Sequence, residues 1–262
     1  MSFILWILIL FMSFPVWAQQ RSKNLNQLAI SQGISSPAMS HTTIFSKGFT
    51  LENPVGASYQ SGYHLTGAVD GSETTSGGME FGVGDTQYGL ALGAYSNDCE
   101  GPPECDPYIR GTLSAIWGGF GIGIGVQEDL YTVGMLFNAN GMHRLGIVAE
   151  FEDRDGVNNR RDSFGLGYAF ILDQFTFSAD FSKRDAEDIT LADDALLITP
   201  GVAVRIDIFS VSVSYDIFVN DRGNNFSDQV WFGLGIRAFS NWEFAFYGEY
   251  VDRWSLMATY FF

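Results

Sequence analysis

The sequence contains few of the residues on which most enzymes, metal proteins and nucleic-acid-binding proteins depend. Its 262 residues include 2 cysteines, 3 histidines and 14 lysines and arginines together, against 30 acidic side chains. The resulting net charge of −16 is unsuited to nucleic acid, whose binding needs Lys and Arg to replace counterions. Nucleophile elbows, phosphate-binding loops and metal-ligand spacings are also missing from the sequence. We therefore expect no nucleic-acid partner, no cofactor, no metal and no catalytic residue.

Long hydrophobic runs are missing from the chain after residue 18. Residues 3–18 are apolar apart from Ser13, and Val16-Trp17-Ala18 before Gln19 has the spacing of a signal-peptidase site. This run is too short for a comfortable membrane-spanning helix. It has no Lys or Arg in front of it, which leaves an uncleaved anchor as the alternative. We expect residues 1–18 to be a signal peptide, and any membrane crossing by the remainder to use strands.

Phenylalanine and glycine are abundant, with 23 and 30 residues, and short segments of alternating polarity recur throughout the chain. This period of two predicts strands. We expect fourteen, at about 57–68, 78–85, 88–97, 107–117, 119–126, 130–138, 142–152, 162–172, 175–183, 196–206, 209–219, 229–239, 242–250 and 254–262.

The connections between these segments alternate between tight turns and longer polar loops. The tight turns lie at 85–87, 118, 138–141, 173–174, 207–208 and 241, and the longer loops at 70–76, 98–106, 153–161, 184–195 and 220–228. Two further members of the longer series, at 127–129 and 252–253, are brief. Such alternation is typical of an outer-membrane barrel with periplasmic turns and extracellular loops. It predicts an all-β fold, a closed antiparallel up-and-down transmembrane β-barrel of fourteen strands over residues 56–262, after a non-strand segment at 19–55 that is periplasmic or a plug.

The chain ends on a strand with one apolar face. Trp254, Leu256, Ala258, Tyr260 and Phe262 alternate with smaller or more polar residues, and the last residue is aromatic. This ending resembles the C-terminal insertion signal of bacterial outer-membrane β-barrels. The resemblance implies that Trp254, Leu256, Tyr260 and Phe262 are read by the barrel-insertion machinery. It also implies a Gram-negative outer membrane as location, with membrane lipid and lipopolysaccharide as partners.

The opposite face of the strands carries charged residues that we expect to line the lumen. These are Glu80, Arg110, Glu150, Glu152, Asp180, Arg205, Asp207, Asp216, Arg237, Glu243 and Glu249. Because carboxylates outnumber arginines in this set, an open lumen would favour cations. The alternative is that these residues form cross-strand ion pairs that brace the barrel.

The segment 19–55 is mildly basic, with Arg21, Lys23 and Lys47 against Glu52, a net charge of +2 that suits an acidic barrel. Its Ser36-Pro-Ala-Met39 and Glu52-Asn-Pro-Val-Gly-Ala57 resemble the Asn-Pro-Ala-type element of the outer-membrane long-chain fatty-acid transporters and related barrels. That resemblance implies fourteen strands around an N-terminal plug and passage of hydrophobic ligands. This chain is much shorter than those transporters, so no binding residue is carried over.

Cys99 and Cys105 flank Gly101-Pro102-Pro103 in a predicted extracellular loop, where the compartment is oxidising. We expect a disulfide that staples this loop, with a stabilisation of roughly 2–3 kcal/mol at most. The acidic stretches at 153–162 and 185–194 do not match a calcium loop, so we interpret them as solvated charge.

A lipid-modifying barrel enzyme is the third functional class considered. It would need a histidine beside a nucleophile or carboxylate. We expect His64 towards the outer end of its strand and His143 beside a periplasmic turn, which would keep them apart. The sequence thus favours a non-enzymatic barrel that allows passive passage of small solutes or of a hydrophobic ligand. The alternative is a non-conducting structural barrel that organises lipid or assembles with copies of itself.

Overall fold

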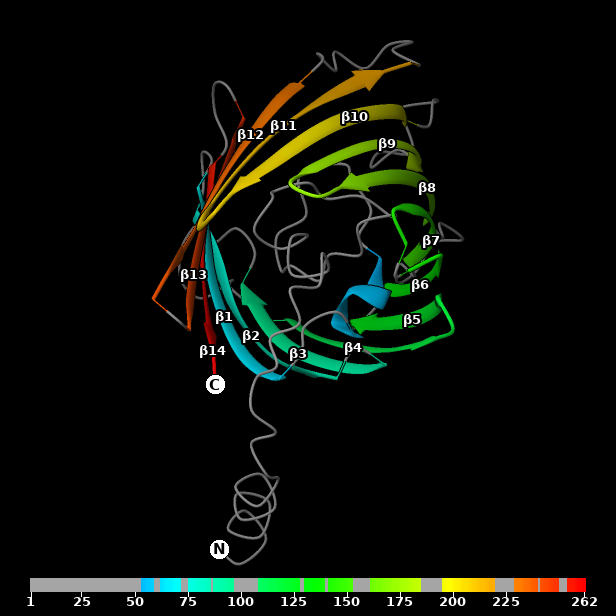
Figure 1. Ribbon diagram of the computed structural model, residues 1–262. Coiled ribbons are helices and arrows are strands. Elements are labelled where there is room, and N and C mark those ends of the chain that lie inside the picture. Colours follow the sequence, from blue (N-terminus) through cyan, green and yellow to red (C-terminus); the bar gives the residue numbers. More distant parts are fainter. Residues whose placement is uncertain are drawn as a thin grey trace, which may run out of the picture.

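In the computed structural model the chain forms a closed antiparallel β-barrel of fourteen strands (Figure 1). The structure describes residues 53–58, 62–71, 75–85, 87–96, 108–127, 130–139, 141–152, 161–184, 195–219, 229–239, 241–249 and 254–262. The strands are β1 (Gly62–Gly71), β2 (Thr75–Gly84), β3 (Tyr88–Ser96), β4 (Tyr108–Trp117), β5 (Phe120–Gln127), β6 (Leu130–Phe137), β7 (His143–Glu152), β8 (Arg161–Leu172), β9 (Phe175–Arg184), β10 (Ala195–Ile206), β11 (Phe209–Phe218), β12 (Gln229–Ala238), β13 (Trp242–Glu249) and β14 (Trp254–Phe261). Each strand pairs with its neighbour in sequence, and β1 pairs with β14. The predicted architecture is confirmed.

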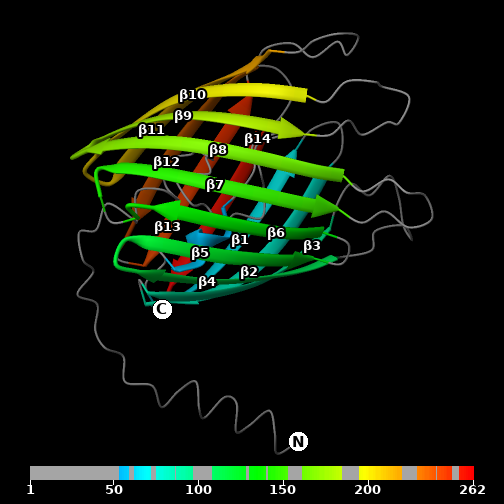
Figure 2. The same ribbon diagram turned by 90° about the vertical axis from the view of Figure 1, so that its right-hand side faces the viewer.

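One end of the barrel carries tight turns that link β2 to β3, β4 to β5 and so on to β12 and β13 (Figure 2, left). We call it the tight-turn end. The backbone has positive φ at Gly118, Asp173 and Asp207, at 56°, 47° and 55°. Two-residue hairpins of this kind need positive φ, which Gly, Asn and Asp tolerate best. Most of each longer predicted connection lies outside the described residues, but the loop expected at 70–76 is shorter than predicted, because β1 continues to Gly71 and β2 begins at Thr75.

Alternation along each strand separates an inner from an outer face. In β11, Ser210, Ser212, Ser214 and Asp216 are buried on the inner face, whereas Val211, Val213 and Tyr215 are exposed on the outer face. Successive side chains of a strand point to opposite faces, so the sequence pattern translates directly into this division. Among the described residues, no helix is long and apolar enough to cross a bilayer.

The first strand begins later than predicted, at Gly62 instead of residue 57. Residues Pro54–Ser58 form a short 3-10 helix, η2, in place of strand. The Asn53 carbonyl accepts a hydrogen bond from the Gly56 amide at 3.0 Å, and the Asn53 side chain accepts one from the Val55 amide at 3.1 Å. These local bonds compete with strand pairing, as asparagine side chains often do in turns.

This shift corrects the expected position of His64. It is the third residue of β1 and pairs with Gly82 and Phe261, near the tight-turn end. The expectation that it lies towards the outer end of its strand is therefore wrong.

Candidate functional site: the inner face of the barrel

The inner face carries most of the charged residues that the sequence singles out. Glu80, Arg110, Glu150, Asp180, Arg205, Asp216, Arg237 and Glu243 alternate with outward-facing neighbours on their strands. Asp207 lies in the tight turn after β10. Glu249 occupies the last position of β13 and pairs with Trp231, whose side chain is on the inner face.

The inner face near the tight-turn end is covered by η2. This helix contacts β2, β3, β4, β5 and β6, and all of its residues are buried. The strands are glycine-rich there. A Cβ on Gly134 would collide with the Asn53 side chain, and one on Gly89 would collide with the Ala57 backbone. Glycine is thus required at Gly89, where the η2 backbone lies directly against the sheet, whereas at Gly134 an added Cβ would displace the Asn53 side chain.

Polar and apolar contacts fix η2 to this surface. Asn53 donates from Nδ2 to the Met135 carbonyl at 2.9 Å, and the hydroxyls of Ser58 and Ser114 are 2.6 Å apart. Val55 is fully buried in a cluster with three apolar inner-face residues, Ile116, Leu136 and Ala139. We call residues 53–58 the anchor, because they attach the N-terminal part of the chain to the inner face.

A buried carboxylate joins β10, β11 and β12. Asp216 is 1% exposed, and its two oxygens accept hydrogen bonds from Thr199 Oγ1 at 2.7 Å and Trp231 Nε1 at 2.9 Å. Two directed donors compensate much of the cost of burying its charge. This arrangement holds the carboxylate in a fixed orientation on the inner face.

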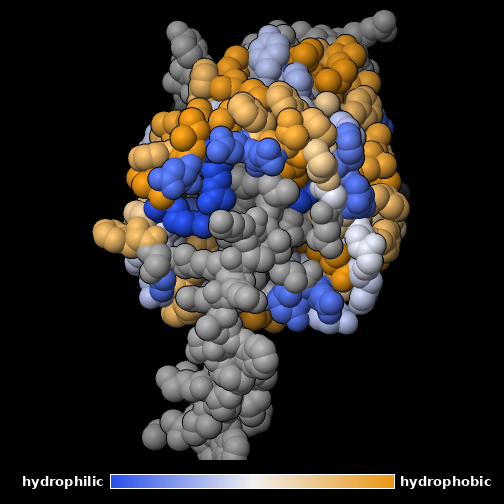
Figure 3. Space-filling view, in the orientation of Figure 1, coloured by the Kyte–Doolittle hydropathy of each residue, from blue (hydrophilic) through white to orange (hydrophobic). Residues whose placement is uncertain are grey.

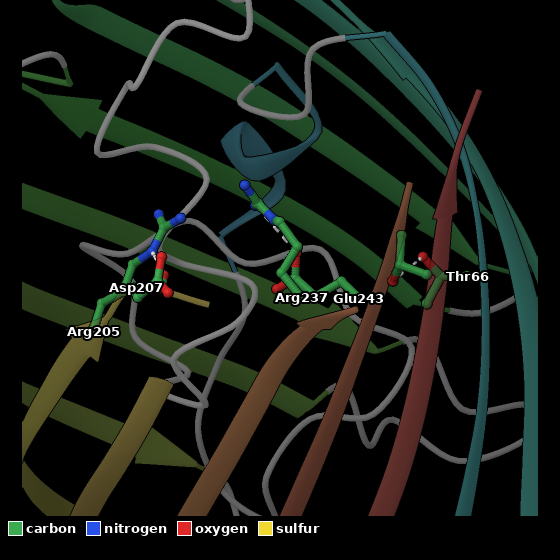
Figure 4. A network of polar contacts seen from close by, with 6 residues as sticks. Thr66, Arg205, Asp207, Arg237 and Glu243 are labelled. Atoms are coloured by element: carbon green, nitrogen blue, oxygen red, sulfur yellow. Dashed lines mark hydrogen bonds and ion pairs between the residues drawn. The ribbon is translucent and has the colours of Figure 1, made fainter. Parts of the chain in front are cut away.

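Arginine and carboxylate groups come together at the tight-turn ends of β10, β12 and β13 (Figure 4). Arg237 Nη2 lies 3.5 Å from Glu243 Oε2, and the Glu243 side chain is 3% exposed. Arg205 donates from Nε to the Asp207 carbonyl at 3.2 Å. Charged groups here make cross-strand and local contacts, as the bracing alternative requires, but they also lie on the face that encloses the lumen.

Sequence reasoning missed two components of this face. Arg144 lies on the inner face of β7, is 1% exposed and contacts the Gly141 carbonyl through Nε at 3.4 Å. It shares the parity of Glu150 on the same strand, which could have identified it. The anchor was recognised as a motif, but the strands it contacts could not be read from the sequence.

The two histidines on the described strands lie apart. His64 is buried on the inner face, and neither ring nitrogen has a hydrogen-bond partner within the described residues. His143 is on the outer face, where Nδ1 lies 2.6 Å from the Tyr168 hydroxyl. The hydroxyl beside His143 is thus that of a tyrosine, and not a serine or a carboxylate.

Several sequence expectations fall outside the part of the chain that the structure describes. These are the signal peptide, the plug segment up to residue 52, the Cys99–Cys105 disulfide and the acidic loops. Within the described residues, no group of three or more His, Cys, Asp or Glu side chains could hold a metal ion.

Comparison with solved structures finds similar barrels at low sequence identity. Salmonella typhi OmpF in complex with daunomycin is 11% identical, with a TM-score of 0.48 over 76% of this chain and 96% of that chain. The outer-membrane channel DcaP of Acinetobacter baumannii is 10% identical, with a TM-score of 0.42 over 76% and 96%. OccK5 of Pseudomonas aeruginosa is 8% identical, with a TM-score of 0.41 over the same shares.

No protein-family model and no curated protein matches the chain. The resemblance to fatty-acid transporters therefore stays a sequence prediction. Similarity to the solved barrels at this level says nothing about the ligand or assembly of this chain.

Proposed function

We propose that the chain is an outer-membrane β-barrel that allows passive passage of small solutes. The observation that carries this proposal is a closed sheet with an apolar outer face and a polar, charged inner face. Outward side chains such as Leu92, Leu113, Val211, Leu234 and Leu256 are each 48–54% exposed. Hydrocarbon tolerates such a surface, and closure leaves no strand edge with unpaired backbone groups.

The aromatic residues of the outer face support this membrane position. Around the tight-turn end they form neighbouring pairs: Tyr88 with Trp117, Phe120 with Phe137, His143 with Tyr168, and Trp242 with Tyr260. Aromatic girdles of this kind lie at the membrane interfaces of outer-membrane barrels. Figure 3 shows hydrophobic residues around the outside of the molecule and hydrophilic ones nearer its centre.

The inner face offers a polar lining with both signs of charge. Its described carboxylates are Glu80, Glu150, Asp180, Asp216 and Glu243, and its described guanidinium groups are those of Arg110, Arg144, Arg205 and Arg237. Three of the arginines lie within two residues of the tight-turn end, whereas most carboxylates lie farther along the strands. We infer a weak preference for cations, smaller than the sequence alone predicts because Arg144 joins the lining.

The N-terminal segment is proposed to act as a plug that limits passage. The anchor attaches residue 53, which directly follows the segment 19–52 in the sequence, to the inner face at the tight-turn end. The net charge of +2 of that segment is complementary to the acidic remainder of the chain.

A specific observation favours the second candidate, a non-conducting barrel. Polar side chains on the inner face of β9 to β11, including Asp180, Ser178 and Ser212, are at most 7% exposed. A lumen filled to this extent would leave only a structural or lipid-organising role, in the membrane or in assemblies of the barrel.

The deciding experiment is single-channel conductance in a planar bilayer, comparing the chain with a version lacking residues 19–50. Steady conductance by the intact chain supports an open pore. Conductance only after the deletion supports a plug and gated passage. If neither the intact chain nor the deleted version conducts, passive passage is contradicted and the non-conducting barrel is favoured.

A further inference from the structure

Three strands on the inner face present hydroxyl groups around a floor of small residues. In the strand pairing, Gly201 of β10 lies between Ser178 of β9 and Ser214 of β11. One step along, Ala203 lies between Thr176 and Ser212. We call Thr176, Ser178, Ser212 and Ser214, with Gly201 and Ala203 between them, the hydroxyl wall.

Three of these hydroxyls are buried without a bonding partner. Thr176, Ser178 and Ser212 are 0%, 7% and 2% exposed, and none of their hydroxyl oxygens has a hydrogen-bond partner within the described part of the chain. Buried hydroxyls in folded proteins are nearly always hydrogen-bonded. Three such hydroxyls, two on β9 and one on β11 with only Gly201 and Ala203 of β10 between them, therefore indicate a hydrogen-bonding occupant of the lumen at this place.

The groups that border the hydroxyl wall restrict the chemistry of that occupant. Along the strands in one direction lies the row of Asp180, Thr199 and Asp216, and in the other lies Arg205, paired with Ser210. Both Asp216 oxygens already accept directed hydrogen bonds, so this carboxylate is a poor primary site for a cation. An anion would meet two carboxylates, and an apolar ligand would leave the hydroxyls unsatisfied.

A neutral molecule with many hydroxyls fits this surface. Serine and threonine hydroxyls each donate one hydrogen bond and accept others, so they can match a ligand whose groups do the same. We propose that the hydroxyl wall binds a carbohydrate, which makes a polyhydroxylated solute the substrate class of the barrel. This inference rests on the proposed function: the three unpaired hydroxyls are at most 7% exposed in this structure, so the sugar must reach the wall through the lumen and displace what covers it.

Isothermal titration calorimetry on the purified full chain, in a detergent without a sugar headgroup, tests the site. The probes are maltotriose and a polyethylene glycol of similar mass, which has far fewer hydroxyls. We expect maltotriose to bind and the glycol not to bind. The double variant Ser178→Ala/Ser212→Ala should weaken maltotriose binding at least fivefold.

Thr132→Val is the matched control, because Thr132 is also a buried inner-face hydroxyl, 2% exposed, but lies on β6. It should bind maltotriose as the unaltered chain does. Since Ser178 and Ser212 make no side-chain hydrogen bond within the described residues, the double variant should fold normally, and its thermal unfolding checks this.

Absence of maltotriose binding, equal binding of the glycol, or undiminished binding by the double variant would each overturn the inference. Conductance in bilayers is measured separately. Conductance without sugar binding rejects the hydroxyl wall but keeps the channel. Sugar binding without conductance keeps the wall and rejects passive passage.

Discussion

Thr66 of β1 and Thr259 of β14 share a side-chain hydrogen bond of 3.0 Å across the seam where the first and last strands close the barrel. Both side chains are buried on the inner face, at 4% and 1% exposure. Near the tight-turn end of the same seam, the Phe262 amide donates to the Tyr63 carbonyl at 3.0 Å. The contact between residues 193 positions apart therefore reports directly on closure.

Thr66→Val and Thr259→Val test this seam. Each variant should lower the free energy of unfolding, because it leaves the remaining buried hydroxyl unpaired, by about 1–3 kcal/mol. The double variant removes both partners, so it should be less destabilised than the sum of the singles. Urea unfolding in detergent or lipid, followed by the shift between folded and unfolded bands on a gel, gives the three values. Strict additivity would show that the two hydroxyls do not interact.

Gly134→Ala tests the anchor. The added Cβ would collide with the Asn53 side chain, so the anchor should separate from the inner face at a cost of about 1–3 kcal/mol. Lys47, six residues before Asn53, should then be cut faster by trypsin. The rate of that cut in the folded barrel is the measurement.

Gly67→Ala is the matched control, because a Cβ at Gly67 meets no atom within 4 Å. Its cleavage rate should equal that of the unaltered chain. An unchanged rate in Gly134→Ala as well would mean that Asn53 does not hold the segment in place.

The strands could be predicted because their information is local. A period of two and turn residues at regular distances are visible in β8 or β11 without any knowledge of their neighbours. The start of β1 at Gly62, five residues later than the sequence predicts, also has a local cause. Asn53 bonds to the backbone of Val55 and Gly56, and this local closure removes Ala57 and Ser58 from the strand.

The inner face was harder to predict because its contacts join residues distant in sequence. The sequence motif at Asn53 could be noticed, but the Met135 carbonyl that it binds is 82 residues away. The glycines that admit the anchor look like ordinary small inner-face residues until η2 is placed against them. Likewise, the hydroxyl wall emerges only when the pairing sets Ser178 and Ser212 beside Gly201 and Ala203.

Arg237→Gln and Glu243→Gln test the charge of the tight-turn mouth. Removing the guanidinium should raise the cation-to-anion permeability ratio, and removing the carboxylate should lower it, because both groups lie on the inner face. Reversal potentials in a salt gradient measure the ratio. The double variant should return close to the original value, whereas shifts in the same direction for both single variants would contradict a lumen position of this pair.

Deletion of Phe262 tests whether the last strand carries the insertion signal. The residue is 59% exposed on the outer face, and its ring lies 4.9 Å from that of Tyr260. Deletion removes this aromatic end together with the amide that bonds Tyr63, so the amount of folded barrel in the outer membrane should fall severalfold.

Phe239→Ser is the matched control: Phe239 is also an aromatic residue at the tight-turn end, 86% exposed, but it lies in a turn outside the strand pairing. Heat-modifiable barrel in membrane fractions is the measurement. An equal loss in both variants would indicate a general need for aromatic residues at this interface, and normal assembly without Phe262 would remove the C-terminal signal from this account.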